Sequence, residues 1–524
     1  MVFIKSYKDQ SWLLPPNVEE LIPDDHVCYL VESLVGSLDF SSFEVKYSGA
    51  GHPAYHPRIL VKLLVMGGLD RVRSSRRLAR NIRENVVYMY LAEKLTPDFR
   101  TISDFRKNNP ELVKAVFEHT IILAKQEGML DLSHLSTDGS KIKANAANKR
   151  VLTKEELEFL LRFVNEEFEE WAKQDHVEDE FFGDLRGSDQ LPKKSKKEIE
   201  KRVRYYTKKF KEQGVLFKEN VTQQLKRAHQ ELEEHNLKKV NTTDPESRFM
   251  KNKKGKIEFS YNIQVSVDKK GLILANDICQ NANDTGQLQP QVLQTEANVG
   301  TLPENVPWSF DSAYYEGENL TFLSNKKIDG YIPDNEKKID NPYDKKHFIY
   351  DPKKDEYTCP ANQPVTFFYE CFDKTKKKKI KIYKGQTCTT CPRKSECTKN
   401  KKDTRYIKSY PHETERNAMN EKMMTQQAKE IYNLRAQTVE PVIGDIKENK
   451  GVQTFLTRSL ETVKTEFNLT CTACNLKKIW VYMQEKDTKI KNAFNNSIQR
   501  IDTQLERLKN TVHNLYFIIV RQPV

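Results

Sequence analysis

The feature that most constrains the fold is a block of alternating apolar residues in the middle of the chain. From Phe259 to Val267 every second residue is apolar, which predicts a half-buried strand. Further elements follow this strand at short intervals. They are a return strand, a helix and another strand, predicted over 272–275, 288–299 and 308–311. This alternation of strands and helices predicts an α/β domain with a mixed sheet.

The other parts of the 524-residue chain differ in pattern from this block, and the length predicts several structural units. Apolar residues recur at helical spacing in the first part, whereas two later stretches are highly charged or rich in cysteine. We therefore expect an all-α N-terminal domain over 1–130, an α/β domain assembled from 131–150, 257–335 and 413–484, a charged helical insertion over 151–256, a basic Cys-bearing insertion over 336–412, and a helical tail over 485–524.

The charge balance favours a polyanionic partner. The net charge is +12, from 86 basic and 74 acidic residues, although a lysine-rich composition alone gives such an excess. Short N-terminal helices carry arginines such as Arg76 and Arg80, which is compatible with a helix-turn-helix-like DNA reader or with a bundle of solvated arginines. No run of about 18 apolar residues and no apolar leader is visible, so we expect no membrane partner and a cytoplasmic, nucleoid-associated location.

Three acidic residues occupy similar places in the predicted α/β domain. Asp138 ends a predicted strand over 133–139, Asp311 ends a later strand, and Glu440 opens a helix. Strand ends on one edge of such a sheet converge, and three carboxylates suit Mg²⁺ or Mn²⁺. Two such ions about 4 Å apart can drive in-line phosphodiester chemistry. By spacing alone, three unrelated helix or turn caps would explain these acids better than a metal site does.

The cysteines suggest a second metal. Cys388 and Cys391 have the two-residue spacer of a zinc knuckle, and Cys397 follows. Cys359 would complete a structural Zn²⁺ site, Cys371 could replace it, and reduced unliganded thiols are the alternative. The pair at 471 and 474 lies in a helical run, where such cysteines are usually small core residues.

Several short segments of the sequence resemble the motifs of bacterial insertion-sequence DDE transposases, and they occur in the same order. They are Thr137-Asp138-Gly139-Ser140 through Ala146, the strand 259–268, the loop Asn283-Asp284-Thr285-Gly286, Asp311-Ser312-Ala313-Tyr314-Tyr315, and the segment from Arg435 through Glu440 to Lys447. Residues 52–108 also resemble the helical domain that precedes such catalytic domains. The resemblance covers roughly residues 10–485.

This resemblance implies an RNase H-like catalytic fold with a mixed sheet, beside the all-α N-terminal domain and the two insertions. It implies that Asp138, Asp311 and Glu440 are catalytic ligands of Mg²⁺ or Mn²⁺. The substrate would be double-stranded DNA, at transposon ends and target, bound by a homodimer or synaptic assembly. Tyr432, Arg435 and Lys447 resemble a signature that contacts DNA, although four residues separate Arg435 from Glu440 where the best-known version has three.

Two other functions remain open at this point. A catalytically inactive relative would bind DNA only, as a repressor, and a nuclease on the same fold would cut without strand transfer. Ala313 and Ser260 stand where the family motifs often have glycine. Asp284 could support the catalytic acids, or it could cap the following helix. Tyr314 and Tyr315 could stack on a displaced base, or they could be core aromatics.

Overall fold

The computed structural model describes residues 17–45, 54–173, 191–252, 255–334, 342–351, 353–373, 378–400 and 404–486. Its first part is helical, as the apolar spacing predicts. The elements are η1 (Val18–Leu21), α1 (Cys28–Gly36), α2 (Ser41–Glu44), α3 (Pro57–Leu69), α4 (Ser75–Glu84), α5 (Val86–Leu91), α6 (Phe99–Asn108) and α7 (Pro110–Gln126). In α3 the side chain of His56 accepts a hydrogen bond from the backbone of Arg58, and Pro57 occupies the first turn.

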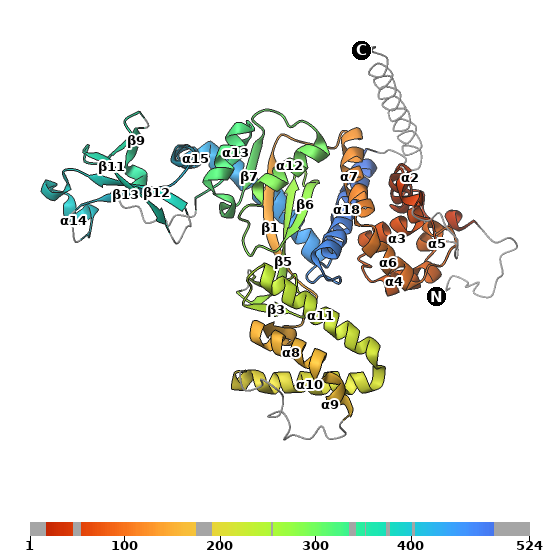
Figure 1. Cartoon of the computed structure of the whole chain (residues 1–524). Helices are drawn as coiled ribbons and strands as arrows, with labels where there is room; N and C mark the ends of the chain where they lie inside the picture. Colours follow the sequence, from red (N-terminus) through yellow and green to blue (C-terminus); the bar gives the residue numbers. More distant parts are fainter. Residues whose placement is uncertain are drawn as a thin grey trace, which may run out of the picture.

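A mixed sheet forms the centre of the molecule (Figure 1). Its strands are β1 (Leu135–Lys143), β4 (Arg248–Lys251), β5 (Ile257–Val267), β6 (Ile273–Cys279), β7 (Pro307–Phe310) and β8 (Asp329–Tyr331). The order is β4-β5-β1-β7-β8, and β6 also pairs with β5. β1 is antiparallel to β5 and parallel to β7, so the predicted mixed α/β architecture is confirmed. Helices α12 (Leu288–Val299) and α13 (Gly317–Asn325) complete this region.

The predicted end of the first strand was wrong. β1 does not turn at Asp138 and Gly139 but continues to Lys143, which is paired with Ser260 of β5. The antiparallel ladder with the long strand β5 extends β1 beyond the polar residues that suggested a turn. Asp138 therefore lies in the middle of β1, paired with Val265 of β5 and one residue past the last position that pairs with β7.

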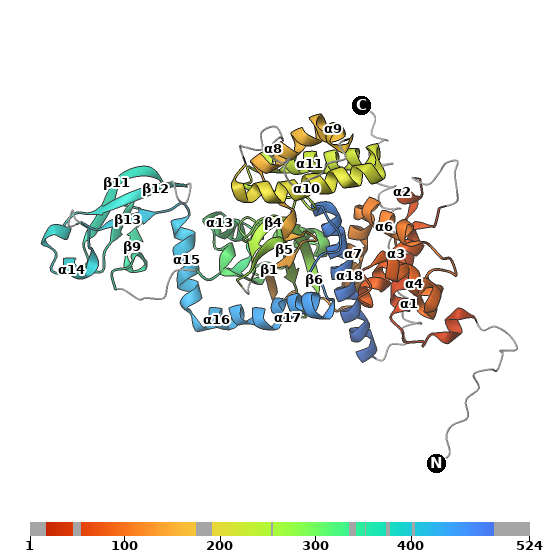
Figure 2. The same cartoon turned by 90° about the horizontal axis from the view of Figure 1, so that it is seen from below.

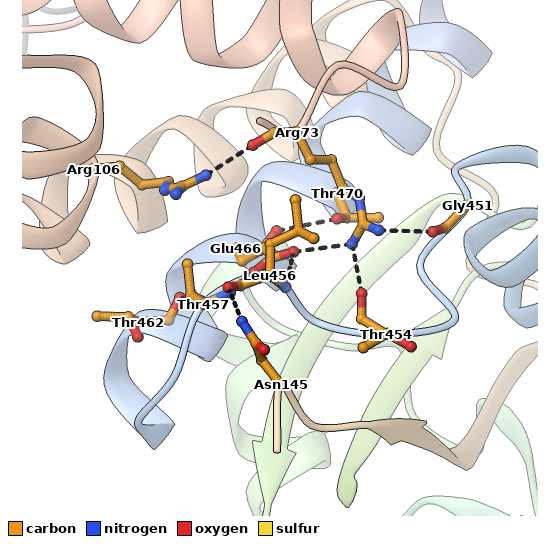
Figure 3. Close-up of polar contacts among 10 residues, drawn as sticks. All are labelled: Arg73, Arg106, Asn145, Gly451, Thr454, Leu456, Thr457, Thr462, Glu466 and Thr470. Atoms are coloured by element: carbon orange, nitrogen blue, oxygen red, sulfur yellow. Dashed lines mark hydrogen bonds and ion pairs between the residues drawn. The ribbon is translucent and has the colours of Figure 1, made fainter. Parts of the chain in front are cut away.

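The N-terminal helices and the sheet share one hydrophobic core. The long helix α18 (Leu460–Glu485) packs against α7 and α3 on one side and β6 on the other. A buried polar connection reinforces this packing (Figure 3). In it, Arg73 reaches from the turn after α3 to the carboxylate of Glu466 at 2.9 Å and to the carbonyl of Gly451 at 2.8 Å. Arg73 thus joins the N-terminal helices directly to α18 and to the segment that precedes it.

The charged insertion forms a helical unit with a small core of its own. It contains β2 (Val151–Thr153), α8 (Lys154–Glu166), α9 (Phe168–Lys173), α10 (Lys193–Gln213), α11 (Val215–Glu234) and β3 (Lys239–Asn241). The apolar side chains that its charged sequence contains are gathered into one cluster, which includes Leu160, Phe163 and Leu225. Figures 1 and 2 show this unit beside one end of the central sheet.

The Cys-bearing insertion is a second, smaller sheet that projects from the side of the central sheet away from the N-terminal helices (Figure 1). Its strands, in the order β13-β12-β11-β10-β9, are β9 (Ile349–Asp351), β10 (Glu356–Thr358), β11 (Pro364–Asp373), β12 (Lys378–Gly385) and β13 (Tyr406–Ser409). The short helix α14 (Lys394–Cys397) lies between β12 and β13. One small cluster of buried apolar side chains lies in the described part of this unit, and it contains Phe348, Tyr357, Val365, Tyr383 and Ile407.

Helices α15 (Glu413–Met424), α16 (Gln426–Asn433) and α17 (Val439–Gly444) lead back along the central sheet (Figure 2). A single π-helical turn, Asp445–Asn449, follows α17. Within the described residues, no helix is both long and apolar enough to cross a bilayer. The predicted helical tail lies outside the described residues, apart from its first two positions at the end of α18.

Candidate metal and DNA site at the edge of the central sheet

Asp138 lies on the central strand, among polar side chains that face one way. Side chains alternate between the two faces of a strand, so Ser136, Asp138 and Ser140 share one face of β1. All three are buried, and Asp138 retains only 6% of its accessible surface. A carboxylate in the middle of a sheet needs compensating partners, because burial penalises its charged form.

Asp311 follows β7, the strand that runs parallel to β1. In this pairing Thr137 of β1 is opposite Phe310 of β7, so Asp138 and Asp311 each come one residue after a paired position. Asp311 also begins the next 3-10 turn, where its Oδ1 accepts a hydrogen bond of 2.7 Å from the backbone of Ser312. The structure therefore brings these two predicted acids to neighbouring positions at one edge of the sheet.

Arg435 connects the two aspartates. Its Nη2 lies 3.2 Å from Oδ1 of Asp138, and its Nη1 lies 3.8 Å from Oδ1 of Asp311. Burial alone would lower the pKa of Arg435, but the charges of Asp138, Tyr432 and Asp311 outweigh it, and the pKa is raised. The guanidinium also donates to the hydroxyl of Tyr432 at 2.9 Å. Arg435 and Tyr432, predicted as DNA contacts, thus form part of the acidic centre in this structure.

The helix that carries Glu440 lies along β1. Thr438 donates to Ser136 at 2.8 Å, and Lys447 donates to Ser140 at 2.5 Å. These two contacts are on either side of Asp138 along the strand. Glu440 comes two residues after Thr438, in the first turn of α17, and its side chain is exposed. The third predicted acid therefore sits on the segment that crosses Asp138, with its carboxylate facing solvent.

Asp284 does not cap the helix that follows it, so that alternative was wrong. Its Oδ1 accepts hydrogen bonds from the side chains of Asn262 at 2.8 Å and Gln264 at 2.6 Å. A Cβ at Gly139 would overlap Asp284 and Gln264, so only glycine fits beside Asp138. Because Asp284 is already held by two amides, we assign it to the support of β1.

The two tyrosines after Asp311 are parts of the packed structure. Tyr314 is fully buried, and its hydroxyl donates to the side-chain carbonyl of Gln264. Tyr315 is half-buried, and its hydroxyl donates to Asn420 of α15 at 3.0 Å. The core interpretation therefore holds for Tyr314, which is not accessible to a base, whereas Tyr315 anchors α15.

Arg76 and Arg80 are exposed on α4, far from the carboxylates. The guanidinium of Arg76 lies over the ring of Phe99, and Arg80 pairs with Glu84 one turn further along α4 at 3.0 Å. Helices α7 and α18 stand between α4 and the central sheet (Figure 1). The structure thus places these arginines on a separate surface from Tyr432, Arg435 and Lys447.

The three predicted acids do not form a closed metal cage. Over the described ranges, the groups of three potential ligands within 4.8 Å of one another lie in the charged insertion, and they are Glu158, His229 and Glu233, and Glu231, Glu234 and His235. Most members of these groups are exposed, as charged helices commonly are. At the sheet edge, Arg435 occupies the space between Asp138 and Asp311 instead.

The cysteines separate into two groups. Cys359, Cys388, Cys391 and Cys397 line one pocket of the small sheet. Burial raises the pKa of the Cys397 thiol, Arg405 lowers it, and the other three cysteines raise it further, so all four lie near one another. Cys371 pairs with Ile380 within the sheet and does not line the pocket. In α18, Cys471 and Cys474 are buried in the main core.

Sequence reasoning missed the residues that hold the acids in place. Ser136, Ser140, Asn262 and Gln264 are buried polar residues on β1 and β5. Their signal in the sequence is the polar half of the strand alternation, which a half-buried strand normally turns toward solvent. Buried polar groups of this kind require partners, which here lie at the start of α17, in the π-helical turn after it and in the loop at Asp284.

Comparison with known proteins gives two matches to family profiles. A profile described as "Transposase DDE domain" matches residues 358–480, which include Arg435, Glu440 and Lys447. A profile described as "Transposase domain (DUF772)" matches residues 16–108, which include Arg76 and Arg80. Asp138 and Asp311 lie between the two matched segments. No curated protein matches the chain.

Proposed function

We propose that this chain, a member of the insertion-sequence DDE transposases, cuts DNA at the ends of its element and joins them to a target, with Asp138, Asp311 and Glu440 as ligands of divalent ions. The observation that carries this proposal is the convergence of Asp138 and Asp311 on Arg435 beneath the helix that bears Glu440. The family in general implies a DNA-cutting and joining enzyme with a DNA substrate.

The catalytic part is proposed to have an RNase H-like fold. A central β1, antiparallel to β5 and parallel to β7, is compatible with it. This arrangement puts one predicted acid in the central strand and the next at the end of the neighbouring parallel strand. A site at such an edge is where α/β sheets generally bind ligands.

The donor set at this edge fits a hard divalent cation such as Mg²⁺ or Mn²⁺, the ions that carboxylates suit. Asp138 and Asp311 already share one cation, the guanidinium of Arg435, so both carboxylates point toward a common place. Glu440 adds an exposed carboxylate on the adjoining helix. When bound by these residues, two such ions would activate the attacking oxygen and stabilise the leaving oxygen of a phosphodiester.

The protein's own residues would hold and orient the DNA. Lys447, anchored on Ser140, is proposed to hold a phosphate as a point charge. Tyr432 and Arg435 are proposed to contact DNA once Arg435 leaves the aspartates to the ions. No covalent link between DNA and a side chain is required. The buried Tyr314–Gln264–Asp284 chain keeps β1 in position under the substrate.

DNA recognition is assigned to the N-terminal helices. Arg76 and Arg80 lie exposed on α4, a ten-residue helix whose buried face consists of Ser75, Leu78 and Ile82. Such a helix can present its arginines to phosphates or base edges, as DNA-reading helices do. We further propose that two or more copies assemble on the element's ends, so that cutting and joining are coordinated.

The decisive experiment is cleavage of a labelled duplex taken from the DNA that flanks the gene. Wild type is compared with Asp138→Asn, Asp311→Asn and Glu440→Gln, in Mg²⁺ and in EDTA. We expect metal-dependent cuts by wild type and none by the three variants, with DNA binding retained. Glu448→Gln is the matched control, because Glu448 is an exposed acid on the following turn whose partner is Gln453.

Each alternative function has its own outcome. Binding without cleavage by wild type, in Mg²⁺ and in Mn²⁺, would reject the proposal in favour of a DNA-binding repressor. Cleavage without products joined to a target duplex would indicate a nuclease on the same fold. Cleavage that survives Glu440→Gln would remove Glu440 from the metal site and leave the two aspartates.

A further inference from the structure

The small sheet of β9–β13 has too small an apolar core to explain how it stays folded. Among its described residues, the buried hydrophobic side chains are the five of the cluster around Tyr357 and Tyr383, together with Ile380 and Ile382 of β12. Three large side chains of β11 are exposed, namely Phe367, Phe368 and Tyr369. In the described part of the connection from β12 to β13, the helical elements are the turn Cys388–Thr390 and α14, and neither contains a buried residue. Units with such small cores generally need disulfides, metals or partners for stability.

Four cysteines meet at the place where this core is missing. Cys359 follows β10, Cys388 and Cys391 flank the turn after β12, and Cys397 ends α14. Together they line one pocket of about 30 Å³, which is room for a single ion or water molecule. None of the nine cysteines forms a disulfide, so these thiols are available as ligands.

The backbone around the cysteines forms the turns that thiolate ligands require. In the first turn the backbone N–H of Gln363 donates to Sγ of Cys359 at 3.4 Å, and Asn362 donates to the carbonyl of Cys359 at 2.8 Å. In the second turn Cys391 donates to the carbonyl of Cys388 at 3.3 Å. A backbone N–H aimed at sulfur stabilises a thiolate, as hydrogen bonds to any charged group do.

Two further features of the pocket favour a charged sulfur cluster. Gly385 lies directly against Cys388, and a Cβ there would overlap its Sγ, so glycine leaves the space that the sulfur occupies. Arg405, Arg393 and Lys394 also line the pocket, and Arg405 donates to the carbonyl of Cys397 at 3.2 Å. Four thiolates around a divalent ion carry net negative charge, which these basic residues offset.

We propose that Cys359, Cys388, Cys391 and Cys397 bind one structural Zn²⁺, which fastens the β12–β13 connection to the turn after β10. One ligand comes from the turn after β10 and three come from the β12–β13 connection, and together they would form a closed tetrahedral site, as in structural zinc centres. Each thiol loses its proton as it coordinates, so binding releases protons and strengthens as the pH rises. The site is independent of the proposed cleavage chemistry, because it shares no residue with it.

The four sulfurs must move together slightly to hold an ion. Among the described residues, the close groups of three ligand atoms do not include the cysteines, so their sulfurs are spread around the pocket by more than 4.8 Å. A tetrahedral site with zinc–sulfur distances of about 2.3 Å requires a tighter set. Side-chain rotation of Cys391 and Cys397, both half-exposed, can provide this closure without change to the strands.

The test is the metal content of the purified full-length protein after incubation with Zn²⁺ and removal of excess ion. We expect about one tightly held zinc per wild-type chain, and loss of that zinc in Cys388→Ser and in Cys359→Ser. Cys371→Ser is the matched control and should keep it, because Cys371 lies in the same sheet but outside the pocket. Gly385→Ala should weaken retention, since the new methyl group displaces the sulfur of Cys388.

A second measurement needs no variant. Titration of the wild-type protein with Co²⁺ should give the thiolate charge-transfer absorption and visible bands of a tetrahedral sulfur site, and Zn²⁺ should abolish them. The proposal fails if wild type retains no zinc and shows no such spectrum, or if Cys388→Ser retains zinc as wild type does. Both outcomes can be read separately from DNA cleavage, so they do not depend on the activity of the sheet-edge site.

Discussion

Nη2 of Arg435 lies 3.2 Å from Oδ1 of Asp138, and both side chains keep only 8% of their accessible surface. A buried pair of this kind is strongly affected when one partner is removed, because the other charge stays buried. The same guanidinium reaches Asp311 at 3.8 Å, so one arginine compensates two of the proposed metal ligands. On the proposed function, metal binding would therefore be coupled to the position of Arg435.

Arg435→Gln should destabilise the metal-free protein by about 3 kcal/mol, because Asp138 loses the charge that compensates it. Mg²⁺ should restore part of this loss by taking over that role, so the variant gains more thermal stability from Mg²⁺ than wild type does. Thermal unfolding with Mg²⁺ and with EDTA measures both effects. Arg80→Gln is the control and should cost at most about 1 kcal/mol, since its pair with Glu84 is exposed. Equal losses in the two variants would contradict the role given to Arg435.

Gly139→Ala should impair cleavage while leaving DNA binding intact. The added methyl group would overlap Asp284 and Gln264, and the strand must shift next to Asp138 to relieve this. A displacement of about 1 Å at a reacting group can cost about a hundredfold in rate, which single-turnover cleavage would reveal. Gly36→Ala is the control, because a Cβ there meets nothing within 4 Å. Cleavage by Gly139→Ala at the wild-type rate would show that the packing beside Asp138 is unimportant.

Local patterns in the sequence were enough for much of the fold. The alternation from Phe259 to Val267 predicted β5, and the apolar spacing over 288–299 predicted the bounds of α12. The family resemblance was confirmed by two profile matches. These features depend on residues that are close in the chain, where strand and helix periodicities are visible.

Features that depend on distant partners could not be predicted in this way. Asp138 lies in mid-strand because β1 pairs with β5 beyond the apparent turn, and Arg435 is buried because two aspartates meet it. The spacing of Cys388 and Cys391 is visible in the sequence, but the choice of Cys359 over Cys371 depends on how the strands pair. Such contacts join residues that are far apart in the chain, so no local sequence pattern predicts them.

The connection between Arg73 and Glu466 should contribute strongly to stability. Glu466 is buried at 3% side-chain exposure and accepts bonds from Arg73 and from the backbone of Leu456 and Thr457 (Figure 3). Glu466→Ala should cost about 3 to 5 kcal/mol, because it removes the counter-charge of Arg73 and leaves two backbone donors without their acceptor. Arg73 keeps its bonds to the carbonyls of Gly451 and Thr454. Chemical denaturation, followed by the fluorescence of Trp308 and Trp480 in the same core, measures the loss.

The matched comparison is Glu304→Ala, which removes the partner of Lys327. That pair has the same 2.9 Å separation but is 65% and 70% exposed, so its loss should cost at most about 1 kcal/mol. If the two variants unfold alike, burial does not make the Arg73–Glu466 pair more stabilising than an exposed pair.

Asp244 should make the fold more stable as the pH falls toward 4. Burial raises its pKa from 3.8 to about 6, despite a hydrogen bond of 2.8 Å from the hydroxyl of Tyr261. The folded state therefore binds the proton more tightly than the unfolded state, so stability is lost as the pH rises from 3.8 to 6. The full loss, about 3 kcal/mol, is present above pH 6. Asp244→Asn should recover part of it at pH 7.5 and nothing near pH 4, as unfolding midpoints at the two pH values would show.

Asp268 is the comparison that separates desolvation from hydrogen bonding as the cause of the stability change. Burial raises its pKa to about 6 as well, but both of its oxygens accept backbone N–H groups, from Leu272 at 2.7 Å and Asp131 at 3.0 Å. In Asp244 the Oδ2 atom has no hydrogen-bond partner among the described residues. An asparagine amide is therefore tolerated at 244, whereas at 268 its NH₂ group would face a backbone donor and cost about 1 to 3 kcal/mol. Asp268→Asn should thus destabilise the protein at pH 7.5 while Asp244→Asn stabilises it. Stabilisation by both variants would mean that desolvation alone, and not the hydrogen bonds, decides the effect.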